Sequence, residues 1–313
     1  MRSSDPDVGA SSAHPSGPPQ RWAVREDNET GVREEVGLFG ADGSKIFACT
    51  HLPSTRARSG LIICSPLHAE FLHNYRKEVM LARALAEAGI AVQRFHYRGT
   101  GNSEGKADDV TFPSMLEDTR VAVESFKEKA PISSIAFLGT RVGAGVASAA
   151  ASDVSEGPLV LWEPVLDPEA YLRQLFRVAS IRELRHDSKM TPQTRQRKRM
   201  SMEQLETDGV VDVLGYAVHR SLFRSLFQHR LPETLGERPR DLLLLQLDQR
   251  DALRDEFATF VGTLRSSGFR VDAQAIVADE HWWFSGNPSH SMQTVRAVIS
   301  ETVDWLVARL GSD

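Results

Sequence analysis

The chemistry of this chain centres on the stretch Gly139-Thr140-Arg141-Val142-Gly143. Its spacing has the outline of a G-x-S-x-G nucleophile elbow, in which a serine on a sharp strand-to-helix turn attacks an acyl carbon. A buried apolar strand leads in and a helix of small residues leads out. The middle position, however, is an arginine, whose guanidinium stays protonated and has no acceptor atom. Arg141 therefore cannot be the nucleophile, and covalent acyl-enzyme chemistry at this position is excluded.

Three neighbouring side chains are candidates for a displaced nucleophile. Thr140 is adjacent, but the elbow geometry would point its side chain away from the site. Cys64 and Ser65 end an earlier strand beside the expected oxyanion loop and are the plausible substitutes. Each also has a structural interpretation, Cys64 as a buried apolar cysteine and Ser65 as the end of a strand before proline.

Arg141 itself has two interpretations of equal weight. A cation at a helix N-terminus opposes the helix macrodipole and lowers stability by about 0.3–1 kcal/mol. Sequences usually break such a local rule where function compensates, or where function has been lost. In the functional interpretation it binds a carboxylate or phosphate of a ligand, with help from the Val142 N–H and from an oxyanion loop near Leu67 and His68. In the structural interpretation it pairs with an acid such as Glu163 or Glu70 and fills a dead site.

An acid and a histidine follow in chain order, each after a later strand. Asp251 and Asp248 both lie just past "LLLLQL"; we prefer Asp251, and interpret Asp248 as a helix N-cap. His281 follows an apolar strand in "VADEHWWFSG". Oriented by Asp251, it would act as a general base on water or on the substrate.

Further candidates for substrate binding lie at the ends of two strands. Glu163 and Trp162 end the strand "GPLVLWEPV", at the sheet edge where α/β proteins bind ligands, and Trp282 follows the histidine. Glu163 and Trp162 could equally be packing or capping residues.

These residues need a mostly parallel sheet to bring them together. "REEVGLF" and "SKIFACTHLP" predict two antiparallel strands at the start. From residue 60 to residue 165, short apolar strands alternate with helices of ten to fifteen residues, which indicates crossover units and a parallel sheet. The same alternation resumes at "DLLLLQL" and ends in a helix from about Ser289, with an apolar stripe of Val295, Ile299, Val303, Leu306 and Leu310.

Two segments fall outside this pattern. Residues 1–29 begin with a Ser-, Pro- and Gly-rich stretch that predicts a disordered tail without the apolar core of a secretory signal. Residues 166–238 contain helical stretches, the basic run "TRQRKR" and no strand signal, so we expect a helical cap inserted between the core segments 30–165 and 239–313. The basic run could contact an acidic partner or a phosphorylated carrier, or form a solvated surface.

Together the motifs resemble the serine aminopeptidase-type branch of the α/β-hydrolase family. Residues 65–105 look like that branch's oxyanion loop, first helix and "R-F-D-Y-R-G-T-G-D-S-x-G" segment. Residues 138–145 and 159–177 look more narrowly like hydrolase-like proteins associated with exosortase systems, some of which also carry G-x-R-x-G. The resemblance runs from about Arg33 to the C-terminus, and the order of nucleophile, acid and histidine agrees with it.

The departures from that family pattern concern the site. His96 and Asn102 stand where aspartates are usual, and Arg141 stands where the nucleophile should be. Intact His281 and Asp251 favour an enzyme, whereas His96 and Asn102 favour decay.

The sequence thus predicts an α/β-hydrolase fold with a cap and, as favoured function, an atypical enzyme for a small or carrier-bound acyl compound (ester, thioester or amide). The resemblance implies a biosynthetic setting of the exopolysaccharide kind. The alternatives are a catalytically inactive binding or scaffold protein and a hydrolase with a displaced nucleophile.

The composition limits which partners, cofactors and cellular location we expect. A net charge of −5 gives no reason to expect nucleic-acid binding, and no stretch approaches the roughly 18 apolar residues of a membrane span. With two cysteines and no metal-ligand spacing near His68 and His73, we expect no metal and no cofactor. We expect a cytoplasmic protein, with a homodimer as an open option.

Overall fold

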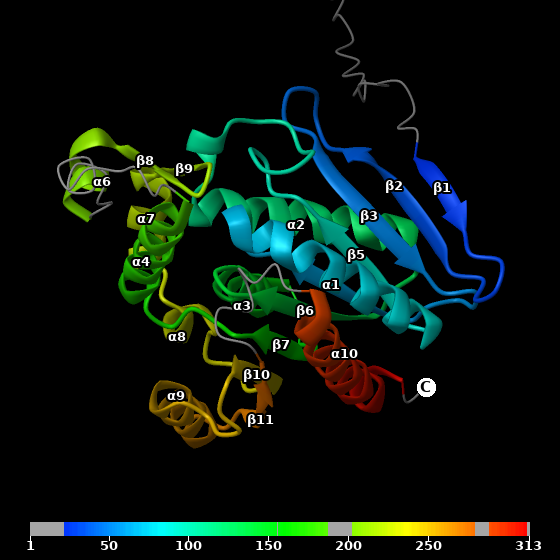
Figure 1. The fold of residues 1–313 in the computed structure, drawn as a ribbon. Helices are drawn as coiled ribbons and strands as arrows, with labels where there is room; N and C mark the ends of the chain where they lie inside the picture. Colours follow the sequence, from blue (N-terminus) through cyan, green and yellow to red (C-terminus); the bar gives the residue numbers. More distant parts are fainter. Residues whose placement is uncertain (1–21, 155, 187–201, 279–287, 312–313) are drawn as a thin grey trace, which may run out of the picture.

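The computed structural model describes residues 22–154, 156–186, 202–278 and 288–311, and its centre is a nine-stranded sheet (Figure 1). The strands of this sheet are β1 (Ala23–Glu26), β2 (Arg33–Phe39), β3 (Ile46–Leu52), β4 (Ser59–Cys64), β5 (Ala91–Phe95), β6 (Ser134–Thr140), β7 (Leu159–Trp162), β10 (Asp241–Asp248) and β11 (Arg270–Val277). Each strand predicted from the alternating pattern is present.

The strand order confirms the predicted mixed, mostly parallel sheet. It runs β1-β2-β3-β5-β4-β6-β7-β10-β11. The pairing is antiparallel along β1-β2-β3-β5. It is parallel along the rest of the sheet, β5-β4-β6-β7-β10-β11. The parallel half needs crossover connections, which the intervening helices supply.

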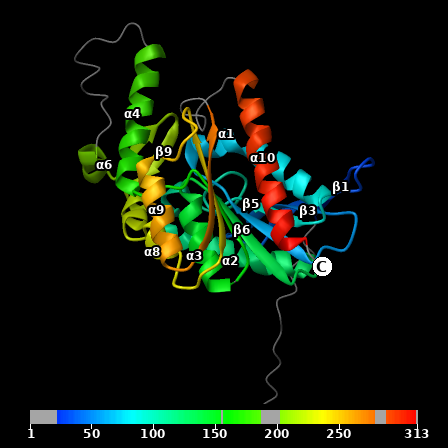
Figure 2. The same cartoon turned by 90° about the horizontal axis from the view of Figure 1, so that it is seen from below.

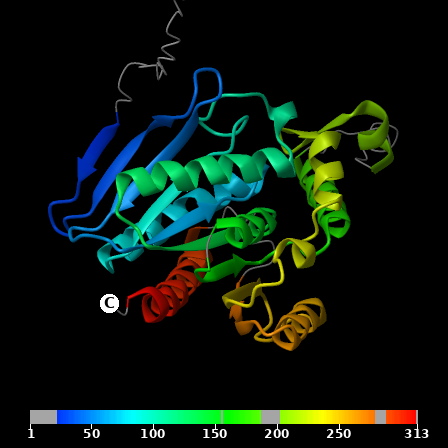
Figure 3. The same cartoon turned by 180° about the vertical axis from the view of Figure 1, so that it is seen from behind.

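Helices cover both faces of the sheet, with α1 packed beside α10 on one face and α2 beside α3 on the other (Figures 2 and 3). The helices of the core are α1 (His68–Glu87), α2 (Phe112–Lys129), α3 (Gly143–Val154), α9 (Asp255–Ser266) and α10 (Pro288–Leu310), with a 3₁₀ turn η1 (Ala107–Asp109). The predicted stripe on α10 packs on the core through all five of its residues. In the described ranges, no helix combines the length and apolar character needed to cross a bilayer.

The parallel strands bring the candidate residues to one edge of the sheet. Cys64 is in register with Gly139, and Thr140 with Trp162, which in turn is in register with Leu245 of β10. The residues that follow these strands therefore lie next to one another at the carboxyl edge, where open α/β sheets bind ligands. The alternation of strands and helices positions the site in this way.

The turn from β6 into α3 has the sharp geometry that the elbow motif predicts. Arg141 has φ of 54°, in the left-handed region that a non-glycine residue rarely occupies. A Cβ added at Gly139 would lie 2.4 Å from the Ala144 Cα, and one at Gly143 would lie 2.2 Å from the Cys64 carbonyl oxygen. Both glycines are needed because backbone passes too close for any side chain.

The start of the chain differs from the sequence prediction, which placed residues 1–29 in a disordered tail. Ala23–Glu26 form β1, paired along the edge of β2. The Trp22 ring lies against Gly37, where an added Cβ would come within 2.8 Å, and the Lys129 ammonium sits 3.3 Å from the ring centroid. Backbone pairing and a cation–π contact therefore order four residues whose own side chains are exposed.

Residues 166–238 contain helices, as expected, but also a hairpin that the sequence did not predict. The helices are α4 (Pro168–His186), α6 (Met202–Asp208), α7 (Arg220–Phe227) and α8 (Leu231–Thr234), and the hairpin joins β8 (Val210–Val213) to β9 (Tyr216–His219). Its two turn residues, Leu214 and Gly215, both have positive φ, as a two-residue hairpin turn requires. Leucine is a poor signal for such a turn, which is why the pattern was missed. The "TRQRKR" run lies outside the described residues.

The elbow geometry predicts opposite effects for two glycine-to-alanine substitutions. Gly143→Ala should lower the free energy of unfolding by about 1–3 kcal/mol or more, because its Cβ meets fixed backbone. The control Gly262→Ala, inside α9 with nothing within 4 Å, should raise it by about 0.5–1 kcal/mol. Urea denaturation of both variants measures the difference. Equal effects would show that the turn is not tightly packed.

Candidate functional site

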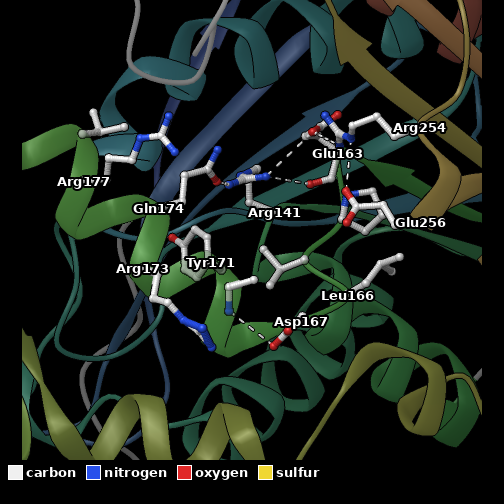
Figure 4. Close-up of a pocket in the computed structure, with 14 residues that line it drawn as sticks. Arg141, Glu163, Leu166, Asp167, Tyr171, Arg173, Gln174, Arg177, Arg254 and Glu256 are labelled. Carbon is white, nitrogen blue, oxygen red and sulfur yellow. Dashed lines mark hydrogen bonds and ion pairs between the residues drawn. The ribbon is translucent and has the colours of Figure 1, made fainter. Parts of the chain in front are cut away.

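The side chain at the centre of the elbow is buried, and each of its three nitrogens donates a hydrogen bond to another protein group (Figure 4). Arg141 is 5% exposed. Its Nε donates to Glu70 Oε1 at 3.0 Å, its Nη2 to Gln174 Oε1 at 3.2 Å, and its Nη1 to the Glu163 carbonyl oxygen at 3.5 Å. Nη1 also lies 4.0 Å from the Glu163 carboxylate, and the guanidinium carbon lies 5.2 Å from the centre of the Tyr171 ring.

The two carboxylates beside Arg141 are themselves held by further partners. Tyr171 donates its hydroxyl to Glu70 Oε2 at 2.8 Å. Glu163, at φ of 46°, accepts the Leu247 N–H at 2.8 Å and is ion-paired with Arg254. We call Glu70, Arg141, Glu163 and Arg254 the elbow ion network. It contains two cations and two carboxylates, so its formal charges balance.

Burial and charge act in opposite directions on this network. Burial raises the pKa of Glu70 and of Glu163, while the positive charges of Arg141 and Arg254 act against that rise. For Arg141, burial lowers the pKa but Glu70 and Glu163 outweigh it, so its pKa is raised above the ordinary value. The arginine is therefore a permanent cation that needs both carboxylates.

None of the three candidate substitutes for the nucleophile is available at the elbow. Cys64 is fully buried, and burial raises the pKa of its thiol to about 12. Ser65 is 3% exposed and donates its hydroxyl to Glu78 at 2.7 Å. Thr140 is fully buried. The low exposure of these groups matches the structural interpretation of each, because a nucleophile must reach its substrate.

The expected oxyanion residues adjoin the turn. Val142, the residue after Arg141, is buried. The carbonyl oxygens of Cys64 and Ser65 lie against Gly143, so the segment that leads to Leu67 and His68 passes beside the elbow. His68 has φ of 54°, and burial lowers the pKa of its imidazole to about 4. It is neutral at pH 7 and adds no positive charge to the site.

The remaining candidates are separated by the structure. Asp248 accepts from Arg254 at 3.2 Å and from the Arg250 N–H, so it is an anchored side chain at the end of β10. Asp251 is exposed in the loop that follows. Trp162 is buried and donates its indole N–H to Thr302 of α10, so it is not among the pocket residues. His281 and Trp282 lie outside the described residues.

A pocket of about 510 Å³ opens over the elbow ion network (Figure 4). Its walls come from the segment after β7, from α4 and from the start of α9. The residues that line it are Arg141, Glu163, Pro164, Val165, Leu166, Asp167, Ala170, Tyr171, Arg173, Gln174, Arg177, Val178, Arg254 and Glu256. Of the predicted site residues, the structure brings Arg141 and Glu163 to this pocket.

Three residues of the site were missed by sequence reasoning. Tyr171 and Gln174 stand three positions apart in α4, so they share a helix face, and Arg254 precedes α9. Their partners lie far away in the chain, and only the helical spacing of Tyr171 and Gln174 was available as a signal.

Comparison with known proteins agrees with the fold. The model of the family described as serine aminopeptidase, S33 matches residues 53–218, slightly more than half of the chain. This segment contains the elbow and α4 and ends within β9. A search of curated proteins gave no match.

Solved structures of esterases and serine hydrolases share the architecture at low sequence identity. Est1E from Butyrivibrio proteoclasticus, with bound ferulic acid, has a TM-score of 0.61 and 18% identity over 88% of this chain and 99% of its own. A thermostable carboxyl esterase from Bacillus coagulans has a TM-score of 0.56 and 13% identity over 88% and 99%. XC6422 from Xanthomonas campestris, described as an a/b serine hydrolase without lid, has a TM-score of 0.53 and 17% identity over 88% of this chain and 94% of its own. These matches establish the fold alone.

Removal of the central cation should be costly. Arg141→Met should lower the free energy of unfolding by about 3–5 kcal/mol, because it leaves Glu70 buried beside an apolar group. The control Arg120→Met, which breaks a surface pair with Asp153, should cost about 0–1 kcal/mol. Chemical denaturation measures both. A cost for Arg141→Met no larger than the control's would contradict a structural role for the ion pairs.

The buried acid next to Ser65 predicts a pH effect on stability. Burial raises the pKa of Glu78 to about 7 from 4.5, so folding favours its protonated form. The contribution of the protonated Glu78 carboxyl to the free energy of unfolding is fully present below pH 4.5 and is lost as the pH rises through about 7. Glu78→Gln keeps an acceptor for Ser65 but cannot ionise, so it should be more stable than the parent at pH 8, with a smaller advantage near pH 5.

Thermal unfolding at several pH values measures this difference. Glu87→Gln, an exposed position on the same helix, serves as control and should change stability little. A Glu78→Gln variant less stable than the parent at pH 8 would contradict the assignment.

Proposed function

Because the chain belongs to the serine aminopeptidase S33 family, we propose that it is a non-hydrolysing member that uses the pocket over the elbow to bind a ligand. The observation that supports this proposal is the side chain at the nucleophile position. Arg141 occupies the left-handed residue of the turn, from which a serine hydroxyl would be presented, and it points into ion pairs with Glu70 and Glu163. Acyl-enzyme formation has no nucleophile there.

The geometry favours the structural interpretation of Arg141 over the interpretation as an anion receptor. A ligand carboxylate could bind the guanidinium fully only by displacing Glu70 or Glu163. Either displacement would leave a buried carboxylate without its cation, at a cost of about 3–5 kcal/mol. Arg141 therefore contributes to the floor of the pocket, and the ligand is recognised by the walls.

A second candidate is an enzyme that acts on a small acyl compound through His281 as a general base. Its support is the position of Asp251, exposed in the loop after β10, whereas Asp248 is already anchored by Arg254. In this mechanism His281 and Asp251 would activate water directly, with no covalent intermediate. The oxyanion would be held by the Val142 N–H and the segment at Leu67 and His68.

Activity measurements separate the two candidates. We expect a fluorophosphonate probe to leave the protein unlabelled, and short p-nitrophenyl esters and thioesters to be hydrolysed no faster by the protein than by its His281→Ala variant. A family member with an intact serine elbow, treated in parallel, controls for probe quality. Labelling would demonstrate a displaced serine and overturn the proposal. Turnover that disappears in His281→Ala would favour the general-base enzyme.

A further inference from the structure

Two side chains of α4 join this helix to the elbow ion network. Tyr171 donates its hydroxyl to Glu70 Oε2 at 2.8 Å, and Gln174 Oε1 accepts a hydrogen bond from Arg141 Nη2 at 3.2 Å (Figure 4). Tyr171 and Gln174 stand three positions apart, so they lie on the same face of the helix. Between the residues that the structure describes, these two hydrogen bonds connect α4 to the core, and both involve a charged group of the network.

The apolar side of α4 packs on other parts of residues 166–238, which we call the insert where they are described. The main packing partners of α4 are α7 and β8, and Figures 1 and 3 show α4 and α7 side by side. The Tyr171 ring stacks on Phe223 of α7, with 6.2 Å between the ring centres. Leu172 and Phe176 are buried. The helix therefore buries apolar surface against its neighbours in the insert, and its contact with the elbow is polar.

A second side of the insert is fixed to the core by packing. Helix α7 packs on α2, and α8 packs on α3. The Phe112 N–H donates to Ser225 Oγ at 2.8 Å, and the Phe112 ring stacks on His229 with 4.5 Å between the ring centres. Ser152 Oγ donates to the Leu235 carbonyl oxygen at 2.8 Å. The insert is thus anchored through α7 and α8, whereas α4 is held through the elbow.

The contacts of α4 with the elbow depend on an arginine at position 141. A serine hydroxyl at the same position is attached directly to Cβ and would end well short of Gln174. Arg141 also binds Glu70 Oε1 at 3.0 Å and so fixes the carboxylate whose other oxygen accepts the Tyr171 hydroxyl. Hydrogen bonds to charged groups are stronger than those between neutral groups. Arg141 therefore supports both connections, one directly and one through Glu70.

We propose that Arg141, Glu70, Tyr171 and Gln174 form a clasp that holds α4 closed over the pocket. When the clasp separates, α4 moves away from the elbow and the pocket widens. The residue at the nucleophile position thereby controls access to the pocket. This inference rests on the proposed binding function, since it assigns the control of access to the same pocket, but the clasp does not depend on which ligand binds.

The chemistry of the clasp permits opening at a low free-energy cost. When Tyr171 and Gln174 separate from their partners, water can bind the exposed polar groups in exchange. Arg141 keeps its ion pairs with Glu70 and Glu163 in the open state, so no buried charge loses its partner. Segments that open in this way belong to the parts of a protein with low local stability.

Distances between spin labels on the two walls of the pocket test the proposal. Arg177→Cys on α4 and Ala258→Cys on α9 supply exposed attachment sites on opposite walls. The native Cys49 and Cys64 are buried, so we expect them to stay unlabelled. Double electron–electron resonance then gives the distribution of distances between the labels, without any ligand.

Removal of both hydrogen bonds should open the pocket. Tyr171→Phe combined with Gln174→Leu keeps the ring and the helix but removes the donor and the acceptor. We expect the ratio of closed to open molecules to fall about ten-fold for each hydrogen bond lost. The distance distribution should broaden and shift by more than about 2 Å toward longer distances. If the double variant does not fold, Gln174→Leu alone should give a smaller shift in the same direction.

Matched variants control for general loosening of the chain. Tyr216→Phe removes a hydroxyl from β9, and Gln228→Leu removes an exposed amide at the end of α7, and neither side chain takes part in the clasp. Both should leave the distances as in the parent. A second label pair within the core, Glu87→Cys with Ala258→Cys, should give the same distances with and without the clasp. Unchanged distances between α4 and α9 in the clasp variants, or an equal change in the control variants, would overturn the proposal.

Failure of this inference can be distinguished from failure of the proposed function. If a fluorophosphonate probe labels the protein while the walls separate as expected, the proposed function is wrong and the clasp stands. If the protein is neither labelled nor active and the distances do not change, the clasp is wrong and the non-hydrolysing function stands.

Discussion

The ion pairs between Arg141 and the carboxylates Glu70 and Glu163 are the interaction on which the site depends. The elbow forces the residue at position 141 into the left-handed region and aims it at the carboxyl edge of the sheet. A permanent cation in that position must be neutralised where water is excluded. Glu70 does so from α1 and Glu163 from the end of β7. The position of catalysis in a serine hydrolase is therefore occupied here by a structural contact.

Glu163 extends this contact to the other side of the pocket. One carboxylate oxygen accepts the Leu247 N–H of β10, and the other pairs with Arg254 at the start of α9. Its own backbone also has positive φ, at 46°, a strained conformation that these contacts hold in place. The ends of three neighbouring strands, β6, β7 and β10, are thus joined through one acid. These contacts fix the floor of the pocket, and α4 forms one of its walls.

Much of the fold could be predicted from the sequence because local patterns carry it. The apolar strands, the helices between them and the two glycines of the elbow are all signalled within a few residues. The exceptions are β1, which is ordered by Trp22 and by pairing with β2, and the β8–β9 hairpin, whose Leu214 hides the turn. In the site, pairing of Arg141 with Glu163 or Glu70 was one of two equally weighted interpretations, and the structure pairs it with both. Tyr171, Gln174 and Arg254 were not, because the packing of α4 and α9 over the edge cannot be read from local spacing.

The central claim is tested most directly by a double-mutant cycle between Arg141 and Glu70. The parent, Arg141→Met, Glu70→Gln and the double variant are unfolded in denaturant, and the coupling free energy is obtained from the four values. The account predicts a favourable coupling of at least about 1 kcal/mol, with the double variant more stable than Arg141→Met alone. Additive effects of the two substitutions, with no coupling, would contradict it and would leave the elbow without the contact that fills it.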